Sequence, residues 1–139
     1  MPRLGLFALL TALLAACGGN SGDSSTSQTA AGTWTLVSIG ETTVAAIQPT
    51  LTFASVNQLA GFSGCNQYSG AYRRNEASLY VSALAVTRRA CAEPGAMEME
   101  QRFIAALESA ISIREDNGTL VIESEAEPAP LVFESGPTR

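Results

Sequence analysis

Short runs of alternating apolar and polar residues repeat along the chain from residue 33 onward. They are rich in valine, isoleucine, threonine and aromatic residues and end at glycine, proline or asparagine, as β-strands do. Strands are therefore expected at residues 33–39, 50–54, 59–63, 78–83, 111–115, 119–123 and 131–133. Another is expected within residues 64–73, after a bend that the glycines there permit. Asn117-Gly118 predicts a tight hairpin between the strands on either side of it.

One segment between these strands has the period of a helix. It opens at Glu93-Pro94-Gly95, where proline suits the first helical turn. Two neighbouring apolar lines follow at helical spacing: Met97, Ile104 and Ile111, and beside them Met99, Phe103 and Leu107. A single amphipathic helix must bury such a stripe on a sheet. The pattern predicts a mainly β fold of the α+β class, an antiparallel sheet curled around one packed helix.

The first 31 residues have a different composition and predict an envelope lipoprotein. A short basic start is followed by apolar residues 4–16, which are too few to span a bilayer. Leu14-Ala15-Ala16-Cys17 matches a lipobox, so residues 1–16 are expected to be a signal peptide and Cys17 to be lipidated. The lipid would anchor the protein in the membrane. The alternative is a plain secretory signal peptide cut nearby.

Residues 18–31 contain no large apolar residue and are expected to form a flexible tether. Residues 32–139 then form a single domain of ordinary size. Gly18, rather than aspartate, follows Cys17, and by known sorting rules this favours the outer membrane, with the domain facing the periplasm.

Charge and composition exclude several functional classes. The chain has 13 acidic residues, 8 arginines and a net charge of −5, which argues against nucleic acid as a partner. It contains neither histidine nor lysine, so Ser-His, Cys-His and Ser-Lys nucleophiles are impossible within it. Zinc sites usually need histidine or several cysteines. We expect no catalytic residue, no metal site and no cofactor.

The cysteines fit the same compartment. With Cys17 lipidated, Cys65 and Cys91 are left, and in an oxidising periplasm they are expected to form a disulfide. Two buried free thiols or a redox pair are the alternatives, although a redox pair usually has C-x-x-C spacing.

Six blocks of residues, in this order, resemble the META/HslJ-like domain family over nearly all of residues 32–134. They are Thr33-Trp34-x-Leu36, Pro49-Thr50-Leu51-x-Phe53, Gly64-Cys65-Asn66-x-Tyr68-Ser69-Gly70-x-Tyr72, Leu84-Ala85-x-Thr87-Arg88-x-Ala90-Cys91, Met99-Glu100-x-x-Phe103 and the following Leu107. The resemblance implies an open, cracked β-barrel with a helix, found in envelope lipoproteins linked to stress and antibiotic tolerance. Two residues depart from the family pattern: Gln67 stands where arginine is common, and Arg89 where methionine is common.

The block from Gly64 to Tyr72 has two interpretations. Together with Arg88, its residues Asn66, Tyr68 and Tyr72 are candidates for a binding surface. The alternative is structural: a glycine-dependent turn, an asparagine that caps its own loop, and an anchor for the disulfide. Trp34 is expected to be a core aromatic residue.

Two functions follow from these expectations. The first is a non-enzymatic envelope lipoprotein whose domain binds an unknown envelope protein, in stress response or antibiotic tolerance. The second is a binding module for a lipid or other hydrophobic small molecule inside the curled sheet. It rests on a fold-level analogy with a lipid-binding protein and on the many apolar residues of the domain, which include Leu51, Phe53, Phe62, Ile104, Leu131 and Phe133.

Overall fold

The computed structural model describes residue 1, residues 32–127 and residues 129–136. The expected signal peptide, Cys17 and the tether lie outside these residues. The strands are β1 (Thr33–Ile39), β2 (Thr42–Thr43), β3 (Thr50–Ser55), β4 (Gln58–Phe62), β5 (Gln67–Asn75), β6 (Ser78–Val81), β7 (Ala85–Val86), β8 (Ala110–Asp116), β9 (Thr119–Ser124) and β10 (Leu131–Ser135), and the helix is α1 (Ala96–Glu108).

The fold is mainly β, an antiparallel barrel with one helix, which confirms the predicted fold class; the ring is closed, where the resemblance implied an open, cracked barrel. Neighbours around the ring follow the order β1, β3, β4, β5, β6, β8, β9 and β10, and β10 pairs with β1 to close it. The two short strands lie outside the ring, with β2 on β1 and β7 on β5. The seam between β6 and β8 is the thinnest, because only Ser78 and Ser112 are in register there.

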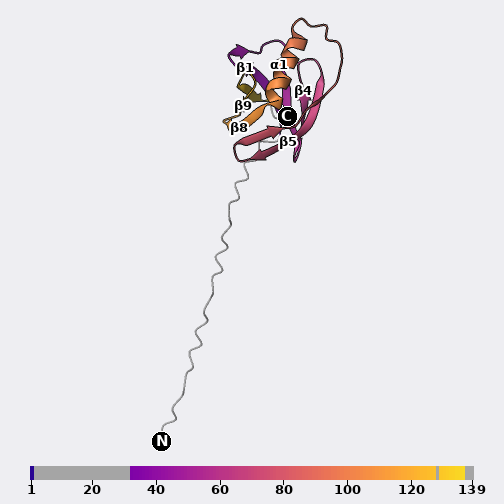
Figure 1. The fold of residues 1–139 in the computed structure, drawn as a ribbon. Coiled ribbons are helices and arrows are strands. Elements are labelled where there is room, and N and C mark those ends of the chain that lie inside the picture. The colour runs from indigo at the N-terminus through magenta and orange to yellow at the C-terminus, as the bar shows by residue number, and fades with distance from the viewer. Residues whose placement is uncertain (2–31, 128, 137–139) are drawn as a thin grey trace.

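Most strands are joined in chain order by tight turns, and α1 is inserted where the chain passes from β7 to β8. The hairpin predicted at Asn117-Gly118 joins β8 to β9, and both residues have positive φ, 48° and 79°. Such a turn matches the twist of the strands that it joins. Figure 1 shows α1 packed against the curled strands.

The barrel interior is filled by side chains of the strands and the helix. Phe103 of α1 is fully buried and makes edge-to-face contacts with Tyr68 of β5 and Phe133 of β10, at 5.6 and 6.3 Å between ring centroids. The largest fully buried side chains are Trp34, Phe103, Phe133, Leu36, Ile39, Leu51, Leu59, Leu107, Ile113, Leu120, Ile122 and Leu131. Trp34 is therefore a core residue, and within the described chain its indole N–H has no hydrogen-bond partner.

The helix is shorter than its apolar pattern suggested. It ends at Glu108, so Ile111 belongs to β8 and its side chain is 49% exposed. Met97, in the first turn, is 50% exposed. The expected stripe is thus wrong at both ends, because only residues over the barrel, such as Phe103 and Leu107, can be buried by it. In the described part of the chain, no helix is long and apolar enough to cross a membrane.

Candidate functional site

The turn between β4 and β5, residues 63–66, carries the central polar cluster of the domain. The backbone N–H of Ser63 donates to the Asn66 carbonyl oxygen at 2.8 Å, which closes the turn, and the Ser63 hydroxyl oxygen lies 2.8 Å from the same carbonyl oxygen. Gly64 has a φ of 107°, a conformation that side chains disfavour. The conformation of the turn therefore depends on the residues within it, above all Gly64, as the glycine-dependent turn interpreted from the sequence predicted.

The Asn66 side chain joins this turn to the segment that follows β7. Its carbonyl Oδ1 accepts from the Thr87 hydroxyl at 2.9 Å and from the Arg89 N–H at 2.7 Å. Its Nδ2 donates to the Arg89 carbonyl oxygen at 3.4 Å. Asn66 is only 2% exposed, so these bonds form away from water, where leaving a polar group unpaired is costly.

The helix completes the cluster through Glu100. Its Oε2 accepts from the Asn66 backbone N–H at 2.9 Å and from the Ser63 hydroxyl, and its Oε1 accepts from Asn66 Nδ2 at 3.1 Å. Asn66 thus uses both amide hydrogens and both lone pairs of its oxygen. We refer to Ser63, Asn66, Thr87, Arg89 and Glu100 as the Asn66 network.

The sequence did not reveal the role of Glu100. Glu100 is half-buried in the network, whereas Glu98, two positions earlier on the same helix, is exposed. No local pattern could have revealed it, because Glu100 and Asn66 lie 34 positions apart in the chain.

Cys65 and Cys91 lie at disulfide distance, with their Cα atoms 5.8 Å apart. They join the same two segments that Asn66 joins, immediately beside it. Thr87 adds a third connection, because its hydroxyl accepts from the Gln67 N–H at 3.1 Å and its own N–H donates to the Gln67 carbonyl oxygen. The irregular segment 87–91 is therefore attached to the barrel at several points.

The four residues predicted as a possible binding surface lie in different environments. Asn66 and Tyr68 are buried, Tyr72 is half-buried against Phe53 with ring centroids 5.1 Å apart, and Arg88 is exposed on the segment that Asn66 holds. Only Arg88 and the edge of Tyr72 are thus open to a partner without rearrangement. Arg89 joins Arg88 on the surface, because its backbone is bound by Asn66 while its side chain is exposed.

Tyr68 is a structural link between β5 and β3. Its hydroxyl donates to the Thr50 carbonyl oxygen at 2.7 Å, beside Gly61 of β4. A Cβ at Gly61 would lie 2.0 Å from that oxygen, so only glycine leaves room for this bond. Burial raises the pKa of the Tyr68 phenol above its ordinary range, because the charged form would lose its hydration.

The chemistry available at this site is that of a polar scaffold. A serine hydroxyl donating to a carboxylate, as Ser63 does to Glu100, could in principle be an activated nucleophile. Ser63 is 0% exposed, however, and its hydroxyl oxygen is also within 2.8 Å of the Asn66 carbonyl oxygen, so a substrate would have no access to it. Within residues 32–127 and 129–136, no three cysteine, aspartate or glutamate side chains come together as metal ligands.

Comparison with known proteins finds one matching protein family and several solved structures with a similar fold. A family model, the META domain, matches residues 27–136, starting five residues before the expected domain boundary at 32. Among curated proteins, none matches the chain.

Three solved structures are similar to the domain. A protein solved by NMR has 22% identity and a TM-score of 0.61, over 75% of this chain and 88% of its own. A protein from Burkholderia xenovorans, also solved by NMR, has 24% identity and a TM-score of 0.59, over 77% and 83%. A DUF4847 family protein from Bacteroides vulgatus ATCC 8482 has 15% identity and a TM-score of 0.57, over 78% and 95%. At these identities the similarity is one of fold.

Proposed function

This chain belongs to the META domain family, and we propose that its barrel is a non-catalytic protein-interaction module, held at the cell envelope by a lipid on Cys17. The observation that carries the proposal is the exposed arginine pair, Arg88 and Arg89, on a segment fixed by the Asn66 network. The segment has no regular secondary structure, yet its backbone is bound at two points: the Thr87 N–H donates to the Gln67 carbonyl oxygen, and the Arg89 N–H donates to Asn66 Oδ1. Binding residues are often found on such loops, positioned by a rigid scaffold.

Fixing the loop before binding lowers the entropy that a complex must lose. Arginine is also among the residues that contribute most to protein interfaces. Because the chain as a whole has a net charge of −5, two adjacent exposed arginines form a local positive site on an acidic protein. The partner best suited to this site is an envelope protein with an acidic surface patch.

The alternative function, a hydrophobic ligand inside the sheet, has less support. Among the described residues, large buried side chains fill the interior, including Trp34, Phe103 and Phe133. A lipid chain there would have to displace well-packed groups, at a cost of several kcal/mol by the usual measure of core disruption.

Site-specific crosslinking in cells tests the interaction. A photo-crosslinking amino acid replaces Ala90, which is exposed beside the two arginines, in the full chain, and a second version carries it at Glu41, which is exposed elsewhere. We expect a discrete product from position 90 that Arg89→Glu weakens and that the matched charge reversal Arg114→Glu on β8 leaves intact. Equal products from positions 90 and 41, or none from position 90, would contradict the proposal.

The anchor is tested separately. Cys17→Ala is expected to abolish labelling by radioactive palmitate and to move the protein from the membrane fraction to the soluble fraction, since lipid chains supply the membrane affinity. Fractionation of inner and outer membranes then tests the outer-membrane assignment. A role in envelope stress or antibiotic tolerance belongs to the same proposal, and a deletion strain with unchanged stress and drug sensitivity would count against it.

A further inference from the structure

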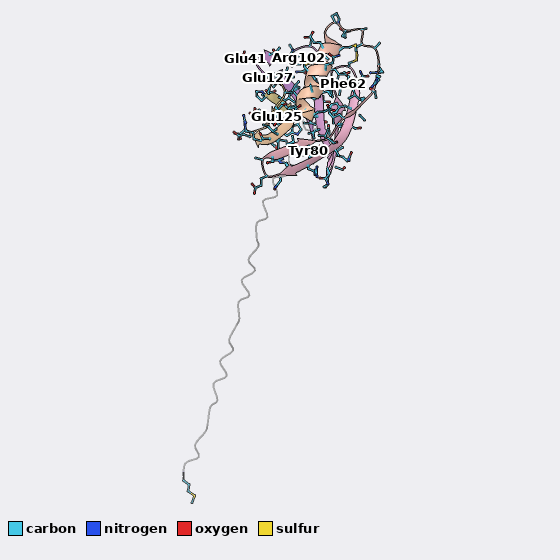
Figure 2. The ribbon with its side chains drawn as sticks, viewed as in Figure 1. Glu41, Phe62, Tyr80, Arg102, Glu125 and Glu127 are labelled. Carbon is cyan, nitrogen blue, oxygen red and sulfur yellow. A yellow bond between two sulfur atoms is a disulfide. The ribbon has the colours of Figure 1, made fainter. Side chains whose placement is uncertain are left out.

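A second site lies on the barrel, apart from the Asn66 network. It is a groove of about 460 Å³ between the turn that joins β3 to β4 and the hairpin of β5 and β6. Its polar lining comes from Asn57, Arg73, Arg74, Asn75, Ser78 and Tyr80. Figure 2 shows Tyr80 at the end of the domain away from Arg102 and Glu41.

The charge of the groove is opposite to that of the protein. Two arginines and no acidic residue belong to the described lining, although the chain carries 13 acidic residues and has a net charge of −5. The two amides and two hydroxyls of the lining add neutral hydrogen-bonding groups. Most of the exposed lining surface is nonetheless apolar, so the groove favours a ligand that carries a negative group on a body with both polar and apolar faces, as a sugar ring has.

Arg73 is held in position by Tyr80. The two residues are in register on neighbouring strands, and the Arg73 guanidinium lies 5.1 Å from the centre of the Tyr80 ring. Stacking of this kind uses the flat face of the guanidinium and leaves its in-plane N–H donors directed at other acceptors. Those donors match the paired oxygens of a phosphate or carboxylate.

Arg74 is positioned by a different contact. Its Nε donates to the backbone carbonyl of Glu76 at 3.0 Å, in the turn between β5 and β6. Asn57, on the facing turn, has a φ of 66°, and its carbonyl oxygen accepts from the Tyr72 N–H, which fixes that turn against β5. Hydrogen bonds to the backbone carbonyl oxygens of Glu76 and Asn57 thus fix the two turns that border the groove.

We infer that this groove binds a small sugar that carries a phosphate or carboxylate group. Its volume is within the range of small-molecule sites and is much larger than a bare phosphate requires. The anionic group would be bound by Arg73, and the sugar hydroxyls by Asn57, Asn75 and Ser78. This site is independent of the interaction proposed for Arg88 and Arg89.

Titration of the full chain, labelled with ¹⁵N, with glucose 6-phosphate and with glucuronic acid tests the inference and separates the two sources of charge. Glucose and inorganic phosphate are the matched probes that lack one half of the ligand. We expect saturable shifts of backbone amides in residues 73–80 with an anionic sugar, and at least about tenfold weaker binding by Arg73→Gln, as the loss of a charged hydrogen bond implies.

Arg114→Gln is the matched control, because it removes the same charge from an exposed arginine of β8 outside the groove. Tyr80→Ala should weaken binding as well, while a thermal melt of each variant checks that it is folded. The inference is overturned if neither anionic sugar binds, if inorganic phosphate binds as tightly as they do, or if Arg114→Gln weakens binding as much as Arg73→Gln.

Discussion

The amide of Asn66 and the carboxylate of Glu100 are joined by a hydrogen bond of 3.1 Å across 34 positions of the chain. This contact ties the turn before β5 to the helix α1. Through the other side of the same amide, the turn is also tied to the segment that presents Arg88. Three separate parts of the chain therefore depend on one buried side chain.

Replacing Asn66 should destabilise the whole domain. Asn66→Ala is expected to lower the free energy of unfolding by about 2–4 kcal/mol, because it removes the part-buried hydrogen bonds that the Asn66 side chain makes with Thr87, Arg89 and Glu100. Urea unfolding measures the loss. Gln67→Ala, which removes the next amide along an exposed position, is the control and should change stability by less than about 0.5 kcal/mol. Equal losses of unfolding free energy in the two variants would show that the hydrogen bonds of the Asn66 side chain do not stabilise the domain.

Gly61 is predicted to be irreplaceable for a steric reason. A methyl group there would meet the Thr50 carbonyl oxygen at 2.0 Å and disturb its bond with Tyr68. Gly61→Ala should cost about 3 kcal/mol or more. Gly32→Ala, at a position with nothing within 4 Å of the added carbon, should be nearly neutral in the same urea experiment. A stable Gly61→Ala protein would mean that β3 and β4 can separate more easily than their packing suggests.

Alkaline pH should destabilise the fold through Tyr68. Burial raises the pKa of its phenol in the folded state, so the unfolded chain loses this proton first. The contribution to stability is constant below the ordinary tyrosine pKa of about 10 and falls above it by about 1.4 kcal/mol per pH unit. Tyr68→Phe should remove this part of the decline, whereas Tyr80→Phe, at an exposed ring, should leave it. A decline that is identical in all three proteins would contradict the assignment.

Reducing conditions should weaken the domain without releasing the Arg88 segment. A disulfide between Cys65 and Cys91, which are 26 positions apart, is expected to contribute about 3–4 kcal/mol by restricting the unfolded chain. Addition of dithiothreitol should lower the urea midpoint of the natural protein but leave a Cys65→Ser, Cys91→Ser double variant unchanged. Amide hydrogen exchange at Arg89 should stay slow in the reduced protein, because Asn66 still accepts from its N–H. Fast exchange there would show that the disulfide alone holds the segment.

The strands and their turns could be predicted with few errors because their signals are local. The β4 strand, expected at residues 59–63, is observed at Gln58–Phe62, and β3, expected at 50–54, is observed at Thr50–Ser55. The two-residue strands β2 and β7 were missed, since neither has an alternating pattern of its own. They exist because β1 and β5 offer free backbone groups beside them.

The candidate site was predicted only in part. Asn66, Cys65 and Cys91 were identified as residues of one turn and its anchor, but Asn66 and Tyr68 were also placed on a possible surface, and both are buried. Whether a side chain points into or out of the barrel depends on how the barrel closes. The residues near Asn66 and Tyr68 in the sequence do not determine that closure.

By itself, the sequence determined most of the elements of this protein, all but the two-residue strands β2 and β7 and the end of the helix. Alternation with a period of two, helical spacing and the Asn117-Gly118 turn depend only on neighbouring residues and on the conformations that each backbone can adopt. The tertiary structure decided what those elements do for one another: that Glu100 of α1 binds the turn at Asn66, that Tyr68 links β5 to β3, and that Arg73 and Tyr80 share one wall of a groove. These contacts form only when barrel closure brings distant segments together. Their physical cause is tertiary packing, and no local sequence pattern predicts them.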